Sequence, residues 1–331
     1  MRPSSPLSLW VAVAFSSLVA IAASAMPVRA NELSFAQWLD GFKREAEEKG
    51  LSPATLDRTL ARVQPIPRVL ELDRRQPEVT LTFQQYIERV INDRRVETAR
   101  RLLGEHRPLL ARVSQRYGVQ PRFIVALWGI ETDFGRFTGD FSVFAALATL
   151  AYDGRRSNFF RGELMQALRI VEAGYATPEQ MRGSWAGAMG QSQFMPSSFL
   201  KYAVDYEERG RRDIWTSLPD VFASIANYLK ENGWQGDQTW GRAVKLPQGF
   251  DAALVGLTVA RPLPEWHALG ARRPDGGPLP ARELPASLVL PGGPEGPAFL
   301  VYGNYRAIMR YNPSIFYATA VGQLADRIEG G

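Results

Sequence analysis

Glu131 is the residue in this sequence best suited to acid–base chemistry. It interrupts the apolar run "ALWGIETDFG" at 126–135 and follows Trp128, Leu127 and Ile124 by three, four and seven residues. On a helix these spacings place all four side chains on one face, which must be the buried one. Burial and the negative end of the helix dipole both disfavour the charged carboxylate, so the pattern predicts a raised pKa for Glu131. A raised pKa is what a general acid needs near neutral pH.

The same pattern also fits a structural glutamate that is capped by local donors or rotated just out of the core. Structural networks perturb carboxylates too, so the spacing alone leaves both interpretations open. Asp133 lies two residues further on and faces elsewhere on the helix. We expect it to hold the turn at Gly135.

Other arrangements that could support catalysis are weaker. Only His106 and His267 are present, and each is expected to be structural or solvated. "GQSQF" at 190–194 resembles a nucleophile elbow, but Phe194 replaces the final glycine and no strand pattern precedes it. The chain has no phosphate-binding glycine loop and no cysteine, which excludes disulfides, thiolate nucleophiles and cysteine zinc sites.

The stretch from Asp205 to Thr216 has the outline of a calcium loop. Loop positions one, three, six and nine are occupied by Asp205, Glu207, Gly210 and Asp213. However, Arg209 and Arg211 fall on two ligand positions, and Thr216 stands where the closing glutamate belongs. Guanidinium groups repel a cation, so we expect no metal and no cofactor. The two arginines are expected to hold the loop by salt bridges; the candidate partners are Glu207, Asp213 and Asp220.

The elements that would position these residues are mainly helices. Helical patterns run from Ser34 to about Lys230, and the helix that carries Glu131 is predicted from Pro121 to about Thr132. The many arginines between residues 82 and 117 are interpreted as solvated helix faces rather than a binding patch.

The composition changes after about Gly241. Prolines, glycines and short apolar runs between residues 246 and 299 predict a small β-containing insertion. Residues 304–328 then read as a strand or turn followed by a helix. We therefore predict a mainly α (α+β) protein. Its parts are a helical region and core at 31–245, a small β-containing subdomain at 246–300, and a C-terminal segment at 301–331 that returns to the core.

Residues 1–30 are predicted to be a secretory signal peptide. Arg2 precedes an apolar stretch from Leu7 to Ala23, and small residues favour cleavage after Ala25 or Ala30. As a membrane anchor this stretch is short, no other stretch is long enough to span a bilayer, and no cysteine can carry a lipid. We expect an exported, soluble protein with no stable membrane anchor.

The charge balance is weakly positive. Residues 1–30 hold two arginines and no acid, so the rest of the chain has 37 basic and 34 acidic residues, a net charge of +3. This balance suits an anionic polymer surface without identifying one. Nucleic-acid binding usually leaves a stronger, clustered pattern, so no nucleic-acid partner is expected.

Four stretches, in this order along the chain, closely resemble the B-type lytic murein transglycosylases, bacterial peptidoglycan-cleaving enzymes with a lysozyme-like core. The stretches are "YGVQPRFIVALWGIETDFG", "GSWAGAMGQSQFMPSSF", "RRDIW…LPDVFASIANYL" and "MRYNPSIFYATAVGQLADRI". The resemblance extends from about Ser34 to Ile328. It implies a lysozyme-like catalytic core within 31–245, peptidoglycan glycan strands as the binding partner, and a periplasmic location.

The resemblance implies a reaction without water. Family members cleave between N-acetylmuramic acid and N-acetylglucosamine, and one glutamate first protonates the glycosidic oxygen. It then takes a proton from the muramoyl C6 hydroxyl, which attacks C1 and leaves a 1,6-anhydromuramoyl end. By its motif Glu131 matches this acid/base, which explains why one promising carboxylate appears where ordinary glycosidases need two.

Residue-by-residue matching implies substrate contacts in the middle of the chain. Ser184 and Gln193 match family positions that hydrogen-bond the substrate near the acid, in a glycine-rich stretch whose backbone lets a sugar approach closely. Tyr228 matches a tyrosine of the cleft. The alternative is a purely structural role, in which the glycines allow helices to pack and the tyrosine is part of the core.

The returning segment and an arginine pair complete the implied site. Tyr311, Asn312 and Tyr317 match the family's C-terminal segment, where aromatic faces stack on sugars and hydroxyls form hydrogen bonds. Arg155 and Arg156 match a pair beside the cleft and could meet peptide or lactyl carboxylates. Their alternative is a surface salt bridge of little energetic value.

Two rival functions stay open at this point. A water-using muramidase could share the fold, and it would need a second carboxylate that holds a water molecule. A non-catalytic wall-binding or scaffold protein is the other rival, and a buried acid kept beside Ser184 and Gln193 argues against it. Some relatives carry an acid-rich calcium loop and a lipidated cysteine, and neither is found here. The sequence names no protein partner, and we expect a monomer.

Overall fold

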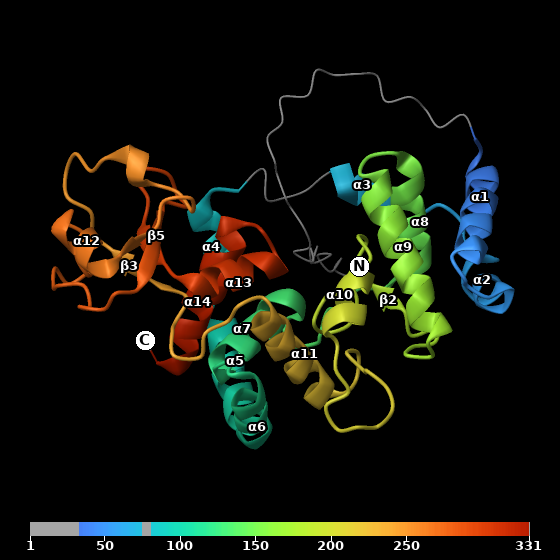
Figure 1. Cartoon of the computed structure of the whole chain (residues 1–331), viewed down its shortest axis with the longest axis horizontal. Coiled ribbons are helices and arrows are strands. Elements are labelled where there is room, and N and C mark those ends of the chain that lie inside the picture. Colours follow the sequence, from blue (N-terminus) through green and yellow to red (C-terminus); the bar gives the residue numbers. More distant parts are fainter. Residues whose placement is uncertain (1–32, 75–80, 331) are drawn as a thin grey trace, which may run out of the picture.

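The computed structural model describes residues 33–74 and 81–330, so the predicted signal peptide at 1–30 lies outside the described residues. Helices make up most of this part of the chain, and the larger of two small sheets lies at one end of the molecule (Figure 1). None of the described helices is long and apolar enough to cross a bilayer.

In the described residues before Pro121, six helices precede the one that carries Glu131. Their starts follow the local sequence: Ser34 and Ser52 cap the first two helices by accepting a backbone N–H, and Pro53 occupies the first position of the second. In order they are α1 (Phe35–Glu48), α2 (Pro53–Leu60), α3 (Pro67–Arg74), α4 (Phe83–Val90), α5 (Asp93–Glu105) and α6 (Arg107–Tyr117). The arginine-rich stretch therefore forms α4 to α6, as its periodicity predicts.

Helix α7 spans Pro121–Thr132, the range predicted from the sequence, and ends where Asp133 adopts a left-handed conformation. Every residue from Phe123 to Thr132 is buried, so α7 is surrounded by protein instead of burying a single face. Helices α8 (Val143–Asp153) and α9 (Ser157–Glu172) follow and pack against each other. Figure 1 shows these two helices beside α1 and α2, at the opposite end of the molecule from the larger sheet.

The glycine-rich stretch after α9 is not helical, unlike the prediction for Ser34 to Lys230. A two-stranded antiparallel sheet, β1 (Phe141–Ser142) and β2 (Arg182–Gly183), opens it, and an irregular loop runs from Ser184 to Met195. The loop ends at α10 (Pro196–Tyr202), and α11 (Leu218–Glu231) comes later. The left-handed residues Gly187, Gly190 and Gln193 explain the difference, because a helix cannot continue through such positions.

The second sheet has four antiparallel strands in the order β3-β6-β5-β4. They are β3 (Gly241–Val244), β4 (Arg261–Pro262), β5 (Pro285–Val289) and β6 (Ala298–Val301), with a short 3-10 turn (Ala252–Leu254) and α12 (Leu263–Ala268) between them. The sheet thus begins before the predicted boundary at residue 246 and ends one residue after 300. "GRAV" is too short and too mixed in polarity to be recognised as a strand from its pattern.

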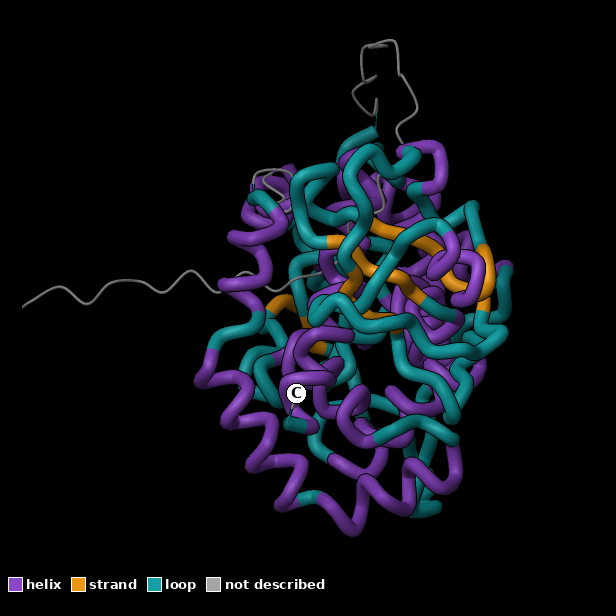
Figure 2. Tube along the Cα trace, turned by 90° about the vertical axis from the view of Figure 1, so that its left-hand side faces the viewer, coloured by secondary structure: helices purple, strands orange, loops and turns teal. Residues whose placement is uncertain are grey.

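The sheet is buried on both faces. Along β6, Ala298 and Leu300 join a small core with Trp266, whereas Phe299 and Val301 join the main core of the helical body. Helices α13 (Gly303–Tyr311) and α14 (Ile315–Glu329) then return, and α14 packs on α7 and α5. Figure 2 shows the strands in the upper and middle part of the trace, whereas the lower part consists of helices and loops. The C-terminal return predicted from the sequence positions α14 against the Glu131 helix.

Candidate active site

Glu131 is buried in the last turn of α7, with 7% of its surface exposed. Tyr317, in the first turn of α14 and fully buried, donates a hydrogen bond from its hydroxyl to the Glu131 carboxylate. Two residues 186 positions apart in the chain therefore meet because α14 packs along α7.

Three tyrosines lie close enough to Glu131 for its charge to influence them. Burial is the main cause that raises the pKa of Tyr228, Tyr311 and Tyr317, and the negative charge of Glu131 raises each pKa further. All three hydroxyls therefore keep their protons at neutral pH and act as hydrogen-bond donors.

The hydroxyls of Tyr228 and Tyr311 link separate parts of the chain. Tyr228 on α11 donates to the backbone oxygen of Arg310 at 2.5 Å, and Tyr311 donates to the backbone oxygen of Ser192 at 2.5 Å. The first bond ties α11 to the end of α13, and the second ties that end to the glycine-rich loop. The tyrosines predicted from the motif thus come together around Glu131.

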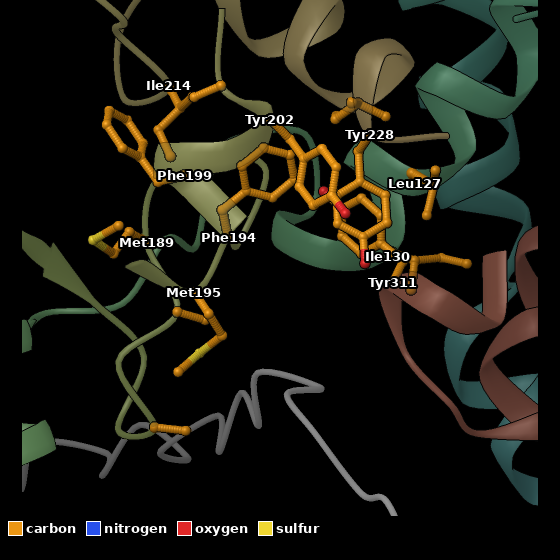
Figure 3. Close-up of a cluster of buried hydrophobic side chains, with 14 of the residues drawn as sticks. Leu127, Ile130, Met189, Phe194, Met195, Phe199, Tyr202, Ile214, Tyr228 and Tyr311 are labelled. Carbon is orange, nitrogen blue, oxygen red and sulfur yellow. The ribbon is translucent and has the colours of Figure 1, made fainter. Parts of the chain in front are cut away.

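The rings of these tyrosines belong to an aromatic cluster. Figure 3 shows Phe194, Tyr202, Tyr228 and Tyr311 grouped between α7, α10 and α11. The ring centroids of Tyr228 and Tyr311 are 4.6 Å apart, and those of Tyr202 and Tyr228 are 4.5 Å apart. Because all four side chains are largely buried, the cluster mainly stabilises this wall of the site and leaves little free ring face for stacking on a sugar.

Gln193 presents an acceptor from the glycine-rich loop. Its amide nitrogen donates to the backbone oxygens of Thr138 (3.0 Å) and Gly190 (2.9 Å), and its backbone is left-handed. Among the described residues no donor lies within hydrogen-bonding distance of its buried Oε1. A buried acceptor without a partner is costly, so this oxygen is available to a donor from a ligand.

Ser184 has a different local role. Its hydroxyl oxygen accepts the Ala188 backbone N–H at 3.1 Å, and its backbone N–H donates to Ala188 at 2.8 Å, so it closes the turn of the loop. The hydroxyl proton is left to donate. Gly139 packs directly on this backbone, where a Cβ would lie 2.2 Å from the Gly183 oxygen. The close approach keeps residues 135–139, which follow α7, against the loop.

Asn312 and the arginine pair are held by structural contacts. Asn312 is 3% exposed and its Oδ1 accepts the Ser314 N–H at 3.1 Å, which shapes the entry into α14. Arg155 and Arg156 both bind the carboxylate of Asp73, which is buried on α3, at 2.9 and 2.6 Å. Both arginines stay partly exposed, so they keep donors for an anionic ligand while the buried aspartate fixes their position.

Arg156 also lies beside the glycine-rich loop. It lines a small pocket with Phe159 and Phe160 of α9, and the other wall is formed by Trp185, Ala186 and Met195. Arg155 is not part of this pocket. Of the pair, Arg156 is therefore the one that the fold brings next to the loop that holds Ser184 and Gln193.

The structure changes two interpretations of charged residues near Glu131. Asp133 does not hold the turn at Gly135, because the Thr132 hydroxyl accepts the Gly135 N–H at 3.0 Å. Asp133 instead faces α5, where it pairs with Arg94 at 2.9 Å and Arg95 at 3.5 Å. Arg95 is 8% exposed, so the interpretation of all these arginines as solvated faces is wrong at this position.

The two histidines lie in structural settings. His106, between α5 and α6, packs edge-on against the rings of Trp128 and Phe222. His267 on α12 contacts Arg272 within the small β subdomain. Both fit the expectation of structural residues.

Sequence patterns missed two residues that shape the site. Gln191 accepts the Trp128 indole N–H at 2.8 Å, donates to the Trp215 oxygen at 2.8 Å, and its backbone oxygen accepts the Thr132 hydroxyl. It locks the last turn of α7 to the glycine-rich loop. Tyr86 on α4 is buried and close enough to Tyr317 to affect its pKa, but its helical spacing reads as ordinary core.

The loop from Asp205 to Thr216 is closed by its own donors. The Asp205 carboxylate accepts three backbone N–H groups, and the Asp213 carboxylate accepts two together with the Thr216 hydroxyl. Arg209 pairs with Glu207, and Arg211 lies 3.8 Å from Asp213. Asp220 accepts backbone N–H groups and binds neither arginine. In the part of the chain that the structure describes, no three acidic or histidine side chains are grouped to hold a metal ion.

A buried glutamate at the end of a central helix, with a tyrosine hydroxyl donating to its carboxylate, on a mainly helical fold is what a lysozyme-like glycan-cleaving enzyme requires. The chain belongs to the transglycosylase SLT domain family, whose model matches residues 34–326. It is an enzyme of the lytic murein transglycosylase type.

Individual relatives agree with this assignment. The chain is 32% identical to membrane-bound lytic murein transglycosylase B of Escherichia coli, with 90% of this chain and 83% of that protein covered. It is 47% identical to SltB3 of Pseudomonas aeruginosa, solved with NAG-anhNAM-pentapeptide; the TM-score is 0.87, and 90% of this chain and 80% of that one are covered. It is 30% identical to the E. coli lytic transglycosylase Slt35, solved in complex with calcium; the TM-score is 0.75, with 89% and 92% covered.

Proposed function

We propose that this protein cleaves peptidoglycan glycan strands in the periplasm, with Glu131 acting first as acid and then as base. The single observation that supports this most strongly is the burial of Glu131 at the end of α7, where its carboxylate accepts a hydrogen bond from the Tyr317 hydroxyl. Family membership supplies the reaction class, and the relative solved with an anhydro-sugar peptide supports the same substrate class.

In the proposed first step the protonated Glu131 carboxyl gives its proton to the glycosidic oxygen. The bond from that oxygen to C1 of the muramoyl sugar breaks, and the glucosaminyl unit leaves as an alcohol. The Tyr317 hydrogen bond stabilises the carboxylate that forms, because a donor aimed at developing charge in a dry site lowers the barrier.

In the second step the Glu131 carboxylate takes the proton of the muramoyl C6 hydroxyl. The C6 oxygen forms a bond to C1 and closes the 1,6-anhydro ring, and the protonated glutamate is regenerated. No water enters, so atoms and protons balance with a single carboxyl group. The nearest carboxylate in the sequence, Asp133, is bound to arginines and does not serve as a second base.

The remaining predicted site residues are proposed to bind the glycan. The free acceptor of Gln193 suits a hydroxyl or amide donor of the sugar, and the Ser184 hydroxyl can donate to a sugar oxygen. Arg156, held by Asp73 beside the glycine-rich loop, suits a lactyl or stem-peptide carboxylate, and Arg155 extends the same charged edge.

The test is mass spectrometry of the muropeptides released from purified peptidoglycan by the wild type and by Glu131→Gln. We expect wild-type products one water lighter than hydrolysis products, and a loss of at least about a thousandfold in rate for the variant. Products of full hydrolytic mass would show a muramidase instead. Absence of products from the wild type would favour a non-catalytic wall-binding protein.

A further inference from the structure

The turn directly after Glu131 has a backbone that only surrounding contacts can maintain. Asp133 and Phe134 are consecutive non-glycine residues with positive φ, 49° and 63°. Side chains other than glycine, asparagine and aspartate rarely adopt this conformation, and phenylalanine is a clear outlier in it. The last turn of α7, which carries Glu131, therefore depends on what holds these two residues.

Phe134 is held by packing. Its ring lies under α7, edge-on to Trp128 at 5.4 Å, and fits only because residue 129 is glycine: a Cβ there would lie 2.6 Å from the ring. This contact fixes the position of Phe134, but it does not fix the direction in which the last turn of α7 points.

Asp133 is held by charge. Its side chain is 3% exposed and pairs with Arg94 and Arg136 at 2.9 Å each and with Arg95 at 3.5 Å. One guanidinium nitrogen of Arg94 contacts both carboxylate oxygens, at 3.2 and 2.9 Å. Two of these arginines come from the start of α5, so the ion pairs fix the position of the end of α7 relative to that helix.

The same helix also holds α14, which supplies the partner of Glu131. Arg327 of α14 binds Asp93 at 2.7 Å, and the Arg100 side chain donates to the backbone oxygen of Arg327 at 3.0 Å. Helix α5 thus contacts both α7 and α14. It therefore fixes the relative position of the two helices that bring Glu131 and Tyr317 together.

We infer that Asp133 is a positioning residue, whose ion pairs with α5 set the alignment of Glu131 with Tyr317 and with the glycosidic oxygen. The inference rests on the proposed function. Asp133 does not touch the reacting atoms, because its carboxylate is buried against the arginines. Its loss should therefore lower the rate of the chemical step and leave substrate binding unchanged.

The experiment measures kcat and KM on soluble glycan strands for the wild type, Asp133→Asn and Asp133→Gly, well below each variant's Tm. Asparagine and glycine both tolerate positive φ, so these variants remove the charge without forcing the backbone. We expect kcat to fall about tenfold to a hundredfold, as for a misplacement of about 1 Å, with KM within about twofold of wild type. The remaining products should keep the anhydro mass.

A matched control is Asp220→Asn. Asp220, in the first turn of α11, is also a buried aspartate, 2% exposed, and its carboxylate accepts the backbone N–H groups of Tyr206 and Asp213. We expect it to lower Tm comparably while kcat stays within about twofold of wild type. If Asp133→Asn lowers Tm but leaves kcat unchanged, Asp133 is only structural and the inference is wrong.

A second variant covers the case in which the Asp133 substitutions prevent folding. Arg94 and Arg136 are about half exposed, so Arg94→Gln with Arg136→Gln should fold and weaken the same ion pairs. We expect a fall in kcat of about three- to tenfold with unchanged KM. An unchanged kcat in this double variant would overturn the inference, and a wild type without anhydro products would overturn both it and the proposed function.

Discussion

At the scale of single residues, the site depends on one carboxyl group whose surroundings come from distant parts of the chain. Glu131 is contacted by Tyr317 of α14, and the loop that carries Gln193 is tied to α7 by Gln191. The chemistry that we propose is assigned to Glu131 alone, and its neighbours hold the side chain in place.

Tyr317→Phe tests, at the residue scale, whether the Tyr317 hydroxyl assists the chemistry proposed for Glu131. The variant keeps the ring and removes only the hydroxyl that donates to Glu131, and a hydrogen bond to a charged group contributes about 1.5–3 kcal/mol. We expect kcat to fall about tenfold to a hundredfold with little change in KM. The measurement is steady-state kinetics on soluble glycan strands.

Tyr305→Phe is the matched control for Tyr317→Phe. Tyr305 is also fully buried, and its hydroxyl contacts the Ile315 oxygen and Thr319 instead of Glu131. It should lower stability without lowering kcat. Equal losses of kcat in both variants would mean that the Tyr317 hydroxyl acts only through packing.

At the scale of elements, the loop from Asp205 to Thr216 is closed by its own hydrogen bonds and ion pairs. We propose that ion pairs of Arg209 and Arg211 and the backbone donors around Asp205 replace any need for a metal. Millimolar calcium should therefore leave the Tm within about 1 °C, since an ion that binds only the folded state must raise it. Differential scanning calorimetry with and without chelator measures this, and a clear rise in Tm would contradict the proposal.

The contact between α9 and α10 predicts a pH effect. Glu163 on α9 is 6% exposed and accepts the Ser197 N–H at 2.9 Å and its hydroxyl at 2.6 Å, yet burial raises its pKa above the ordinary value of 4.5. An acid with a raised folded-state pKa stabilises the fold below its unfolded pKa, and this contribution is lost as pH rises through the folded pKa.

Glu163→Gln should remove that dependence. We expect the Tm of the wild type, relative to the variant, to fall as pH rises from about 4 to about 7. Parallel thermal melts of the two proteins across this range measure the difference. A difference that stays constant, or grows with pH, would show that Glu163 does not titrate as its burial predicts.

At the scale of the whole molecule, the four-stranded sheet lies between two hydrophobic cores and contributes side chains to both, so it is not a separate unit. Trp240, just before β3, packs on Phe299 of β6 and donates from its indole to Asp326 of α14 at 2.9 Å. Gly322 of α14 lies against this ring, where a Cβ would be 2.1 Å from the indole. This close contact is one of those that join the subdomain to the helical body.

Gly322→Ala is expected to lower the free energy of unfolding by about 1–3 kcal/mol, because the added methyl group must displace the Trp240 ring. Thermal and urea melts followed by tryptophan fluorescence measure the loss. Gly162→Ala, on α9 with nothing within 4 Å of the added Cβ, should be neutral or stabilising by about 0.5–1 kcal/mol. If both substitutions changed the free energy of unfolding equally, the close contact between Gly322 and Trp240 would be contradicted.

The sequence by itself determined the helical class and the range of the Glu131 helix, because helix periodicity and capping are local. It also led to Glu131 as the proposed acid, because the family motifs keep their order. The site residues taken from the resemblance stay predictions of substrate contact, although several of them come together around Glu131 in the structure. The start of the sheet was not predicted, because four residues of mixed polarity carry too little periodic signal to identify a strand.

Only the tertiary structure decided which partners the charged and polar side chains take. Asp133 turns to α5 instead of Gly135, Arg155 and Arg156 share Asp73, and Tyr317 reaches Glu131. Each of these contacts joins residues that are far apart in the chain or on different helices. Their geometry depends on how the helices pack, and pairwise spacing along a sequence holds no information about the direction in which a side chain meets another element.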